Sequence, residues 1–251
     1  MEVTINEFAG EYNDNNHLIN KLKRSREYVD GDNHLTDIDW GFYSTHIHSP
    51  FINTYYTAKT LKIDGCRGYA IMRYKIDPSG TDESCFSEIG WNIHQLKYHF
   101  DDIDANLAIN ELVNLVEYNI NLILSYERIN NFYIIPAPSF IRVDTDVNRK
   151  VPYLFTEHLN SKFPQSQLRQ FDVFKTQDLQ SKTMKRGESF PPGTFGSNLF
   201  PYYNVPIVII DDLYGEGATA RAVVSAIRKA GNRNKIIFIS LTYNGFGGIK
   251  K

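Results

Sequence analysis

One stretch of the chain, positions 207–219, constrains the fold more than any other. Its four aliphatic residues, IVII, run directly into two aspartates, Asp211 and Asp212. A strand of aliphatic residues alone is typical of a parallel sheet, because both faces of such a strand are buried. A helical pattern over 219–230 and an apolar strand over 235–242 follow. Strand, helix and strand at these lengths predict a βαβ unit and an α/β fold.

The two aspartates indicate a binding site at the end of the first strand, which we expect over 205–210. Carboxylates at the carboxyl end of a parallel strand emerge at the crevice where open α/β sheets bind ligands. Inside a core, two adjacent carboxylates without partners would be costly. We therefore expect Asp211 and Asp212 to belong to a ligand site.

The turn after the aspartates has the features of an anion site. Gly215 and Gly217 allow close approach of the backbone, and Thr219 adds a hydroxyl donor at the start of the helix. A helix N-terminus presents unpaired N–H groups and the positive end of its dipole, and phosphate is a common occupant. The carboxylates can accept hydrogen bonds from the 2- and 3-hydroxyls of a ribose, and the turn can donate hydrogen bonds to a phosphate. The segment therefore suits a ribose 5-phosphate. The alternative is an ordinary βα turn with an acidic loop. Neither a P-loop nor a dinucleotide fingerprint is present in this segment.

The rest of the chain carries a coarser pattern of elements. Residues 51–76 predict a hairpin with a turn at Asp64 and Gly65, and residues 107–128 predict a long helix. A buried strand over 132–135 ends at Pro136, and a helix over 151–160 follows. Residues 164–204 show little periodicity, which is typical of a long functional loop.

Charge and composition limit the function classes. The net charge of the 251 residues is −2, so the chain as a whole does not predict non-specific binding to nucleic acid. The basic run 21–26 is a solvated helix face or a local contact for a partner or nucleic acid. Stacking of a base on Tyr55, Tyr56, Tyr202 or Tyr203 stays open. The two isolated cysteines and the absence of a long apolar run favour a cytoplasmic protein without a membrane span.

Residues 211–219, DDLYGEGAT, resemble the phosphoribosyl pyrophosphate (PRPP) motif of type I phosphoribosyltransferases, in which two aspartates precede a Gly-Ala-Thr turn. Tyr214, in the fourth position of this motif, resembles the motif of the ComF-like branch of that family. IHQLKYHFDD at 93–102 resembles its Lys-Tyr segment, and IIPAPS at 134–139 resembles its pyrophosphate loop. The resemblance covers roughly residues 90–244.

The resemblance implies a Rossmann-like parallel core over 86–251, with residues 1–85 as an N-terminal extension and hood. It implies PRPP and Mg²⁺, with an unidentified base or amine as acceptor. Asp211 and Asp212 would be catalytic, contacting the ribose hydroxyls and, through them, the metal. A mobile loop would contribute Lys182 and Arg186 as catalytic residues, with Lys175 and Lys185 as further candidates. Substrate would also contact Ala137, Pro138, Ser139, Gly215, Glu216, Gly217, Ala218 and Thr219.

Two departures from the family keep other functions open. Glu216 stands in the phosphate turn, so its carboxylate should face solvent or pair with a cation. The ComF-like zinc ribbon is absent, because the chain has two cysteines. One alternative is a non-catalytic PRPP- or nucleotide-binding regulatory protein. Another is an accessory or effector module of a DNA-uptake or phage-defence system, with a protein partner at the N-terminal region.

Overall fold

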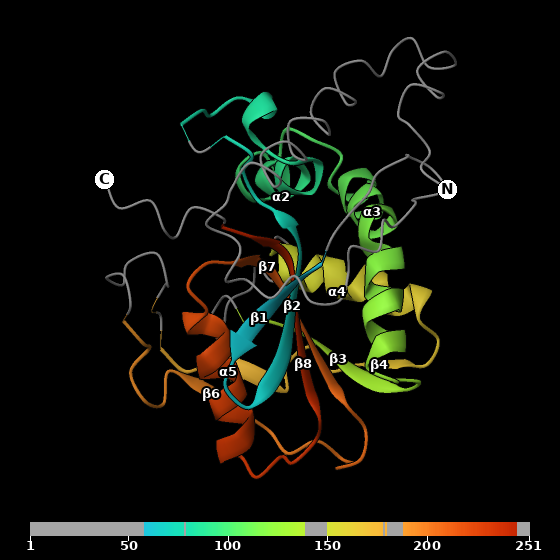
Figure 1. Ribbon diagram of the computed structural model, residues 1–251, viewed down its shortest axis with the longest axis vertical. Coiled ribbons are helices and arrows are strands. Elements are labelled where there is room, and N and C mark those ends of the chain that lie inside the picture. The colour runs from blue at the N-terminus through green and yellow to red at the C-terminus, as the bar shows by residue number, and fades with distance from the viewer. Residues whose placement is uncertain (1–57, 78, 139–149, 178, 180–187, 245–251) are drawn as a thin grey trace.

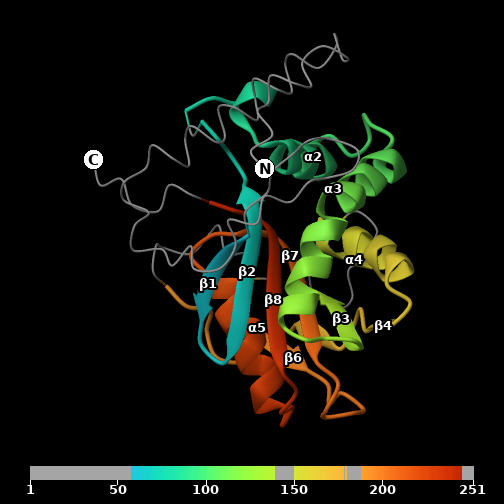
Figure 2. The ribbon, with the colours of Figure 1, turned by 45° about the vertical axis from the view of Figure 1, so that its right-hand side comes forward.

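The computed structural model describes residues 58–77, 79–138, 150–177, 179 and 188–244. These residues form a six-stranded sheet with helices on both faces (Figures 1 and 2). The strand order is β1-β2-β8-β7-β3-β4; β1 is antiparallel to β2, and every other neighbouring pair is parallel. The strands are β1 (Lys59–Ile63), β2 (Cys66–Arg73), β3 (Phe132–Pro136), β4 (Ser166–Leu168), β7 (Ile207–Tyr214) and β8 (Ile236–Tyr243). The expected α/β fold with a mostly parallel sheet is confirmed.

Two apolar clusters cover the two faces of the sheet. One joins the sheet to α2 (Glu88–Tyr98), α3 (Ala105–Tyr126) and α4 (Val151–Lys162). The other joins it to α5 (Ala218–Lys229) and to the small hairpin of β5 (Val173–Lys175) and β6 (Phe195–Ser197). A short 3-10 helix, η3 (Glu83–Cys85), precedes α2. No helix in the described part of the chain is both long and apolar enough to span a membrane.

The long helix α3 shows why the sequence pattern was informative. Asp104 caps its first turn by accepting hydrogen bonds from the backbone N–H groups of Asn106 and Leu107. The helix ends at Tyr126, and Arg128 then adopts a left-handed conformation with φ 56°. The predicted helix over 107–128 is therefore confirmed, with its start two residues earlier.

The predicted hairpin is also confirmed, with Asp64 and Gly65 at the turn between β1 and β2. Gly65 has φ 81°, a conformation that glycine adopts without strain. The second strand, β2, pairs in parallel with β8. The hairpin lies in the segment 1–85 that we predict as an extension, and it continues the sheet formed by the segment 86–251.

Two expectations about the later elements were wrong. The first strand of the βαβ unit does not end at Ile210 but continues to Tyr214, because β8 pairs with it through Asp211, Leu213 and Tyr214. Thr242 strengthens this pairing by donating its hydroxyl to the backbone oxygen of Asp212, at 2.6 Å. The segment 164–204 is not one long loop, since it contains β4, β5 and β6.

A buried carboxylate ties α3 to the amino-terminal edge of the sheet. The Glu127 side chain contacts Lys235 at 2.8 Å and Arg67 at 3.2 Å, and it accepts a hydrogen bond from the Tyr69 hydroxyl. Burial raises the pKa of Glu127, but the hydrogen bonds from Lys235 and Tyr69 outweigh it and hold the pKa below its usual value. The side chains of Arg67 and Lys235 therefore both contact this carboxylate, at the start of β2 and of β8.

Candidate functional site

The direction of the chain changes between β3 and β7. From β3 the chain passes through α4 to β4 on one side, and from β7 it passes through α5 to β8 on the other. The two helices lie on opposite faces of the sheet, so β3 and β7 flank a topological switch point. Ligands of open α/β folds bind at the carboxyl end of such a point.

Four of the predicted site residues come together at this point. The backbone N–H of Ala137, directly after β3, donates to the oxygen of Ile210 at 2.6 Å, and Pro138 follows it. Asp211 and Asp212 come directly after Ile210 on β7. The end of β3 and the aspartate pair, 73 residues apart or more in sequence, thus lie side by side.

The two aspartates project from opposite faces of the sheet, because neighbouring side chains of a strand alternate. Ile210 packs in the cluster of α2, α3 and α4, whereas Ile209 packs in the cluster of α5. Asp212 therefore belongs to the α2 side and Asp211 to the α5 side. The sequence did not reveal this division, since it follows from the continuation of β7 past the pair.

Asp212 pairs with a lysine of α2. The Lys97 ammonium lies 2.8 Å from Asp212 Oδ2, and both side chains are largely buried. Burial lowers the pKa of Lys97, but the carboxylates of Asp212 and Asp211 outweigh it and raise the pKa above its usual value. Lys97 is thus a fixed cation at the site. Sequence reasoning noted its segment but not its role, because the pairing depends on how α2 packs on the sheet.

Asp211 has a strongly perturbed acidity. Burial, together with the nearby Asp212 carboxylate, raises the pKa of Asp211 to about 7. The charges of Lys97 and Lys175 act in the opposite direction but are weaker. Lys175, one of the candidates for the mobile loop, lies in β5 and is buried, with its ammonium donating to the oxygen of Leu179 at 2.8 Å. A proton therefore leaves Asp211 near neutral pH, or when a cation binds beside it.

The turn between β7 and α5 requires glycine at one position. Gly217 precedes α5 with φ 77°, and a Cβ there would lie 2.4 Å from the Tyr214 hydroxyl. A Cβ on Gly215 would meet nothing within 4 Å, so this side of the turn is open. Among the described residues, no side chain caps the first turn of α5, which begins at Ala218 and includes Thr219. Its first N–H groups are therefore available to an anion.

Glu216 is exposed, in keeping with the expectation that its carboxylate faces solvent. Arg221, one turn into α5, donates to the backbone oxygen of Glu216 at 2.8 Å. The arginine also lies close to Gly217, 3.1 Å from the position of a Cβ. A cation therefore lies beside the backbone of this turn.

The implied Mg²⁺ fits this site only together with substrate oxygens. Among the described residues, no group of three or more His, Cys, Asp or Glu side chains could hold a metal ion. Asp211 and Asp212 face different sides of the sheet, and Lys97 occupies one oxygen of Asp212. Mg²⁺ commonly binds through one or two carboxylates plus substrate phosphates, and Asp211 can supply one such ligand.

The remaining predicted residues lie outside the described part of the chain. They are Ser139, Lys182, Lys185 and Arg186, together with the basic run 21–26, Tyr55 and Tyr56. Their proposed roles stay predictions.

No protein-family model matches the chain, and no curated protein matches it significantly. The case for a function therefore depends on the geometry of the switch point and on the motif at 211–219.

Proposed function

We propose that the chain is a PRPP-binding phosphoribosyltransferase of the type I, ComF-like kind. It would transfer a phosphoribosyl group from PRPP to a nitrogenous acceptor and release pyrophosphate. The observation that carries this proposal is the position of Asp211 and Asp212. They lie in the carboxyl-terminal half of β7, beside a topological switch point, and a short turn joins this strand to the N-terminus of α5.

This arrangement suits the three parts of PRPP. The first turn of α5, with Ala218 and Thr219, would bind the 5-phosphate through backbone N–H groups and one hydroxyl. Asp211, on the same face of the sheet, would accept hydrogen bonds from the ribose hydroxyls. Ala137 and Pro138 would lie along the pyrophosphate, at the end of β3.

Lys97 gains a role in this arrangement that the sequence did not suggest. Its ammonium pairs with Asp212 and adds positive charge on the α2 side of the switch point. The pyrophosphate leaving group carries several negative charges, so a fixed cation nearby would stabilise its departure. Lys182 and Arg186 would add to this charge when substrate is bound.

The chemistry asks the protein mainly to position and to stabilise charge. Cleavage at C1 of the ribose passes through an oxocarbenium-like state, as in glycoside hydrolysis. When bound with substrate, Mg²⁺ would neutralise charge on the diphosphate. The carboxylate of Asp211 would hold the ribose in line with the acceptor.

Release of pyrophosphate tests the proposal. Protein, Mg²⁺ and PRPP would be mixed with a panel of purine, pyrimidine and amine acceptors, and pyrophosphate would be measured by a coupled assay. We expect release that is lost in Asp211→Asn and at least tenfold weaker in Lys97→Met, with Lys162→Ala on the exposed face of α4 as a control. Absence of release with every acceptor would contradict the transferase function.

Glu216 favours a second candidate, a non-catalytic PRPP- or nucleotide-binding regulator. A carboxylate within the phosphate turn weakens anion binding and suits a protein that senses its ligand without turning it over. Calorimetry that detects PRPP binding, combined with no pyrophosphate release, would support this candidate. An absence of binding to PRPP and to nucleoside phosphates would refute both candidates.

A further inference from the structure

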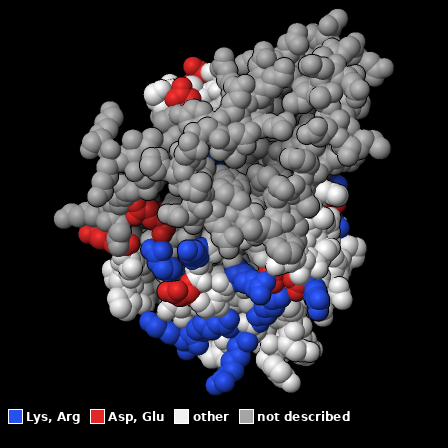
Figure 3. All heavy atoms as spheres, viewed as in Figure 1, with Lys and Arg blue, Asp and Glu red and all other residues white. Residues whose placement is uncertain are grey.

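A band of basic side chains, called the basic band, lies at the end of the sheet where the parallel strands begin, opposite the aspartate site. It consists of seven side chains that lie where β1 ends, where β2, β3 and β8 begin, and where α5 ends: Lys62, Arg67, Arg128, Arg228, Lys229, Arg233 and Lys235. In Figure 3, Lys and Arg side chains gather over the part of the surface formed by the β1–β2 hairpin and α5. The basic band and Asp211 lie toward opposite ends of the parallel strands, because the band is where these strands begin and Asp211 is in the second half of β7.

Contacts among these elements hold the band together. Arg228 donates to the oxygens of Gly65 in the β1–β2 turn, at 3.1 Å, and of Asn234 before β8, at 2.7 Å. Arg67 and Lys235 both contact the buried Glu127. The β1–β2 turn and the ends of α3 and α5 therefore meet at one surface.

Several cations of the basic band are not neutralised by a described carboxylate. Lys62, Lys229 and Arg233 are exposed and make no ion pair with any described residue. Arg67 and Lys235 share the carboxylate of Glu127, and the chain as a whole has a net charge of −2. A hollow of about 410 Å³ beside the end of α5 is lined by Arg228, Gly231, Asn232 and Arg233. Positive charge is thus concentrated on this face, and a ligand with several phosphates would complement it.

Two exposed tyrosines lie beside the band on a firmly held loop. The side chains of Tyr202 and Tyr203 are 60% and 81% exposed. Asn234 donates its amide to the backbone oxygen of Tyr202 at 2.6 Å, and Lys235 of the band follows it directly. The backbone of this loop is therefore held beside the segment that carries Arg233 and Lys235.

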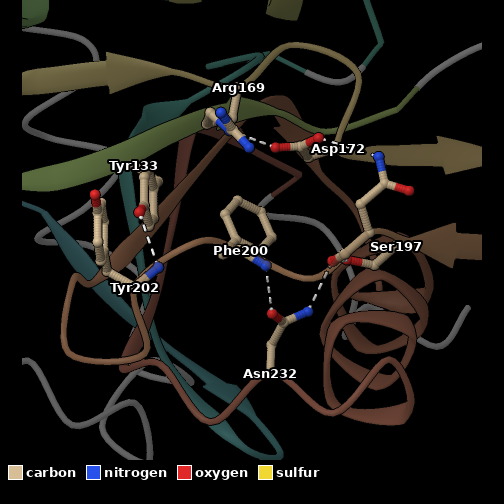
Figure 4. Close-up of polar contacts among 8 residues, drawn as sticks. Tyr133, Arg169, Asp172, Ser197, Phe200, Tyr202 and Asn232 are labelled. Carbon is tan, nitrogen blue, oxygen red and sulfur yellow. Dashed lines mark hydrogen bonds and ion pairs between the residues drawn. The ribbon is translucent and has the colours of Figure 1, made fainter.

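Buried polar side chains fix the shape of this loop (Figure 4). Asn232 accepts from the N–H of Phe200 at 2.8 Å and donates to the oxygen of Asn198 at 2.9 Å. The hydroxyl of Tyr133 accepts from the N–H of Tyr202 at 3.2 Å. Two aromatic rings held in water on a fixed backbone need little further ordering to bind a planar partner.

We propose that this face binds single-stranded nucleic acid, with phosphates along the basic band and bases stacked on Tyr202 and Tyr203. A positively charged surface with adjacent exposed aromatic rings is the combination that binds single strands without sequence preference. A duplex keeps its bases stacked inside and would use the cations alone. The site is distinct from the aspartate site and does not depend on the transferase function.

Fluorescence anisotropy with a labelled 20-nucleotide single strand tests the proposal. With about four phosphate contacts, affinity should fall roughly 50-fold between 50 and 200 mM salt. Tyr203→Ala should weaken binding about tenfold at constant salt. Lys229→Ala/Arg233→Ala should weaken binding and reduce the magnitude of the logarithmic salt slope by about 1.4.

Matched controls separate this face from the rest of the molecule. Tyr118→Ala removes an exposed tyrosine from α3 and Lys162→Ala removes an exposed lysine from α4, and neither should change binding. Asp211→Asn should also bind the strand normally. The proposal is overturned if the single strand does not bind, if a duplex of equal length binds as tightly, if inorganic phosphate at equal ionic strength abolishes binding, or if the Tyr203 and Lys229/Arg233 variants bind like the wild type.

Discussion

Replacing Asp211 with asparagine should stabilise the protein while removing its proposed function. The raised pKa means that the folded protein holds a proton on Asp211 more tightly than the unfolded chain does. Stability is therefore lost as the pH rises from about 4, where the unfolded carboxyl ionises, to about 7, where the folded one does. Asparagine has no such ionisation, and its Oδ1 can still accept the hydrogen bond from the N–H of Asp212.

The size of the effect follows from the two pKa values. A shift from 3.8 to about 7 corresponds to a penalty of about 4 kcal/mol for the fully ionised side chain. Because the Asp211 residue is only half-buried, water reduces this penalty, and we expect roughly 1–2 kcal/mol in the free energy of unfolding. For a chain of this length, that gain raises the Tm by about 2–8 °C.

Thermal unfolding of the wild type and of Asp211→Asn, at pH 4 and at pH 8, measures this difference. The variant should be more stable at pH 8 and nearly equal to the wild type at pH 4. Asp212→Asn is the matched control with the opposite sign, because it leaves the buried ammonium of Lys97 without its carboxylate. If Asp211→Asn destabilises the protein at pH 8, or if both variants shift the Tm in the same direction, the assignment of the two carboxylates is refuted.

Three further substitutions test the rest of the fold. Gly217→Ala should lower the free energy of unfolding by about 1–3 kcal/mol, because it forces a Cβ onto a positive φ against Tyr214, and Gly215→Ala should cost less than half as much; equal losses in thermal melts would contradict this account of the turn. Glu127→Gln should cost roughly 1–3 kcal/mol at pH 7. The deficit in urea unfolding should shrink as the pH falls below about 4.5, where the unfolded carboxyl takes up a proton, and it should disappear once the pH has passed the lower pKa of the folded carboxyl; a deficit independent of pH would argue against the ion pairs. Asn119→Leu should stabilise the protein by about 1–2 kcal/mol in the same assay, because its buried amide has no hydrogen-bond partner among the described residues; a loss of stability would indicate a partner for that amide.

Local pattern was enough to predict most of the elements. The aliphatic run before Asp211 predicted β7, the spacing of apolar residues predicted α3, and the Asp64-Gly65 pair predicted the turn between β1 and β2. Each of these signals lies within a few residues, where side-chain periodicity and turn preference dominate. The same reasoning predicted a parallel strand that leads into the aspartates, although the strand continues two residues beyond them.

The details of the site depend on contacts between distant segments, which no local pattern contains. Lys97 reaches Asp212 only because α2 packs over the end of β7, more than a hundred residues later in the chain. The pairing of β8 with Leu213 and Tyr214 extends β7, and this extension sends the two carboxylates to different faces. Lys175 looked like a residue of an exposed loop, but the pairing of β5 with β6 and two phenylalanine rings nearby enclose it.

The pleat of β7 also limits how this chain can vary over evolution. Inserting or deleting a single residue between Ile207 and Asp211 would exchange the faces of the two carboxylates, so that the lysine of α2 would meet the wrong partner. The length of this strand should therefore be far less tolerant of insertions than its sequence is of aliphatic exchanges. In homologues that keep the function, the number of residues between the start of the strand and the aspartate pair should be constant, even where the aliphatic residues differ.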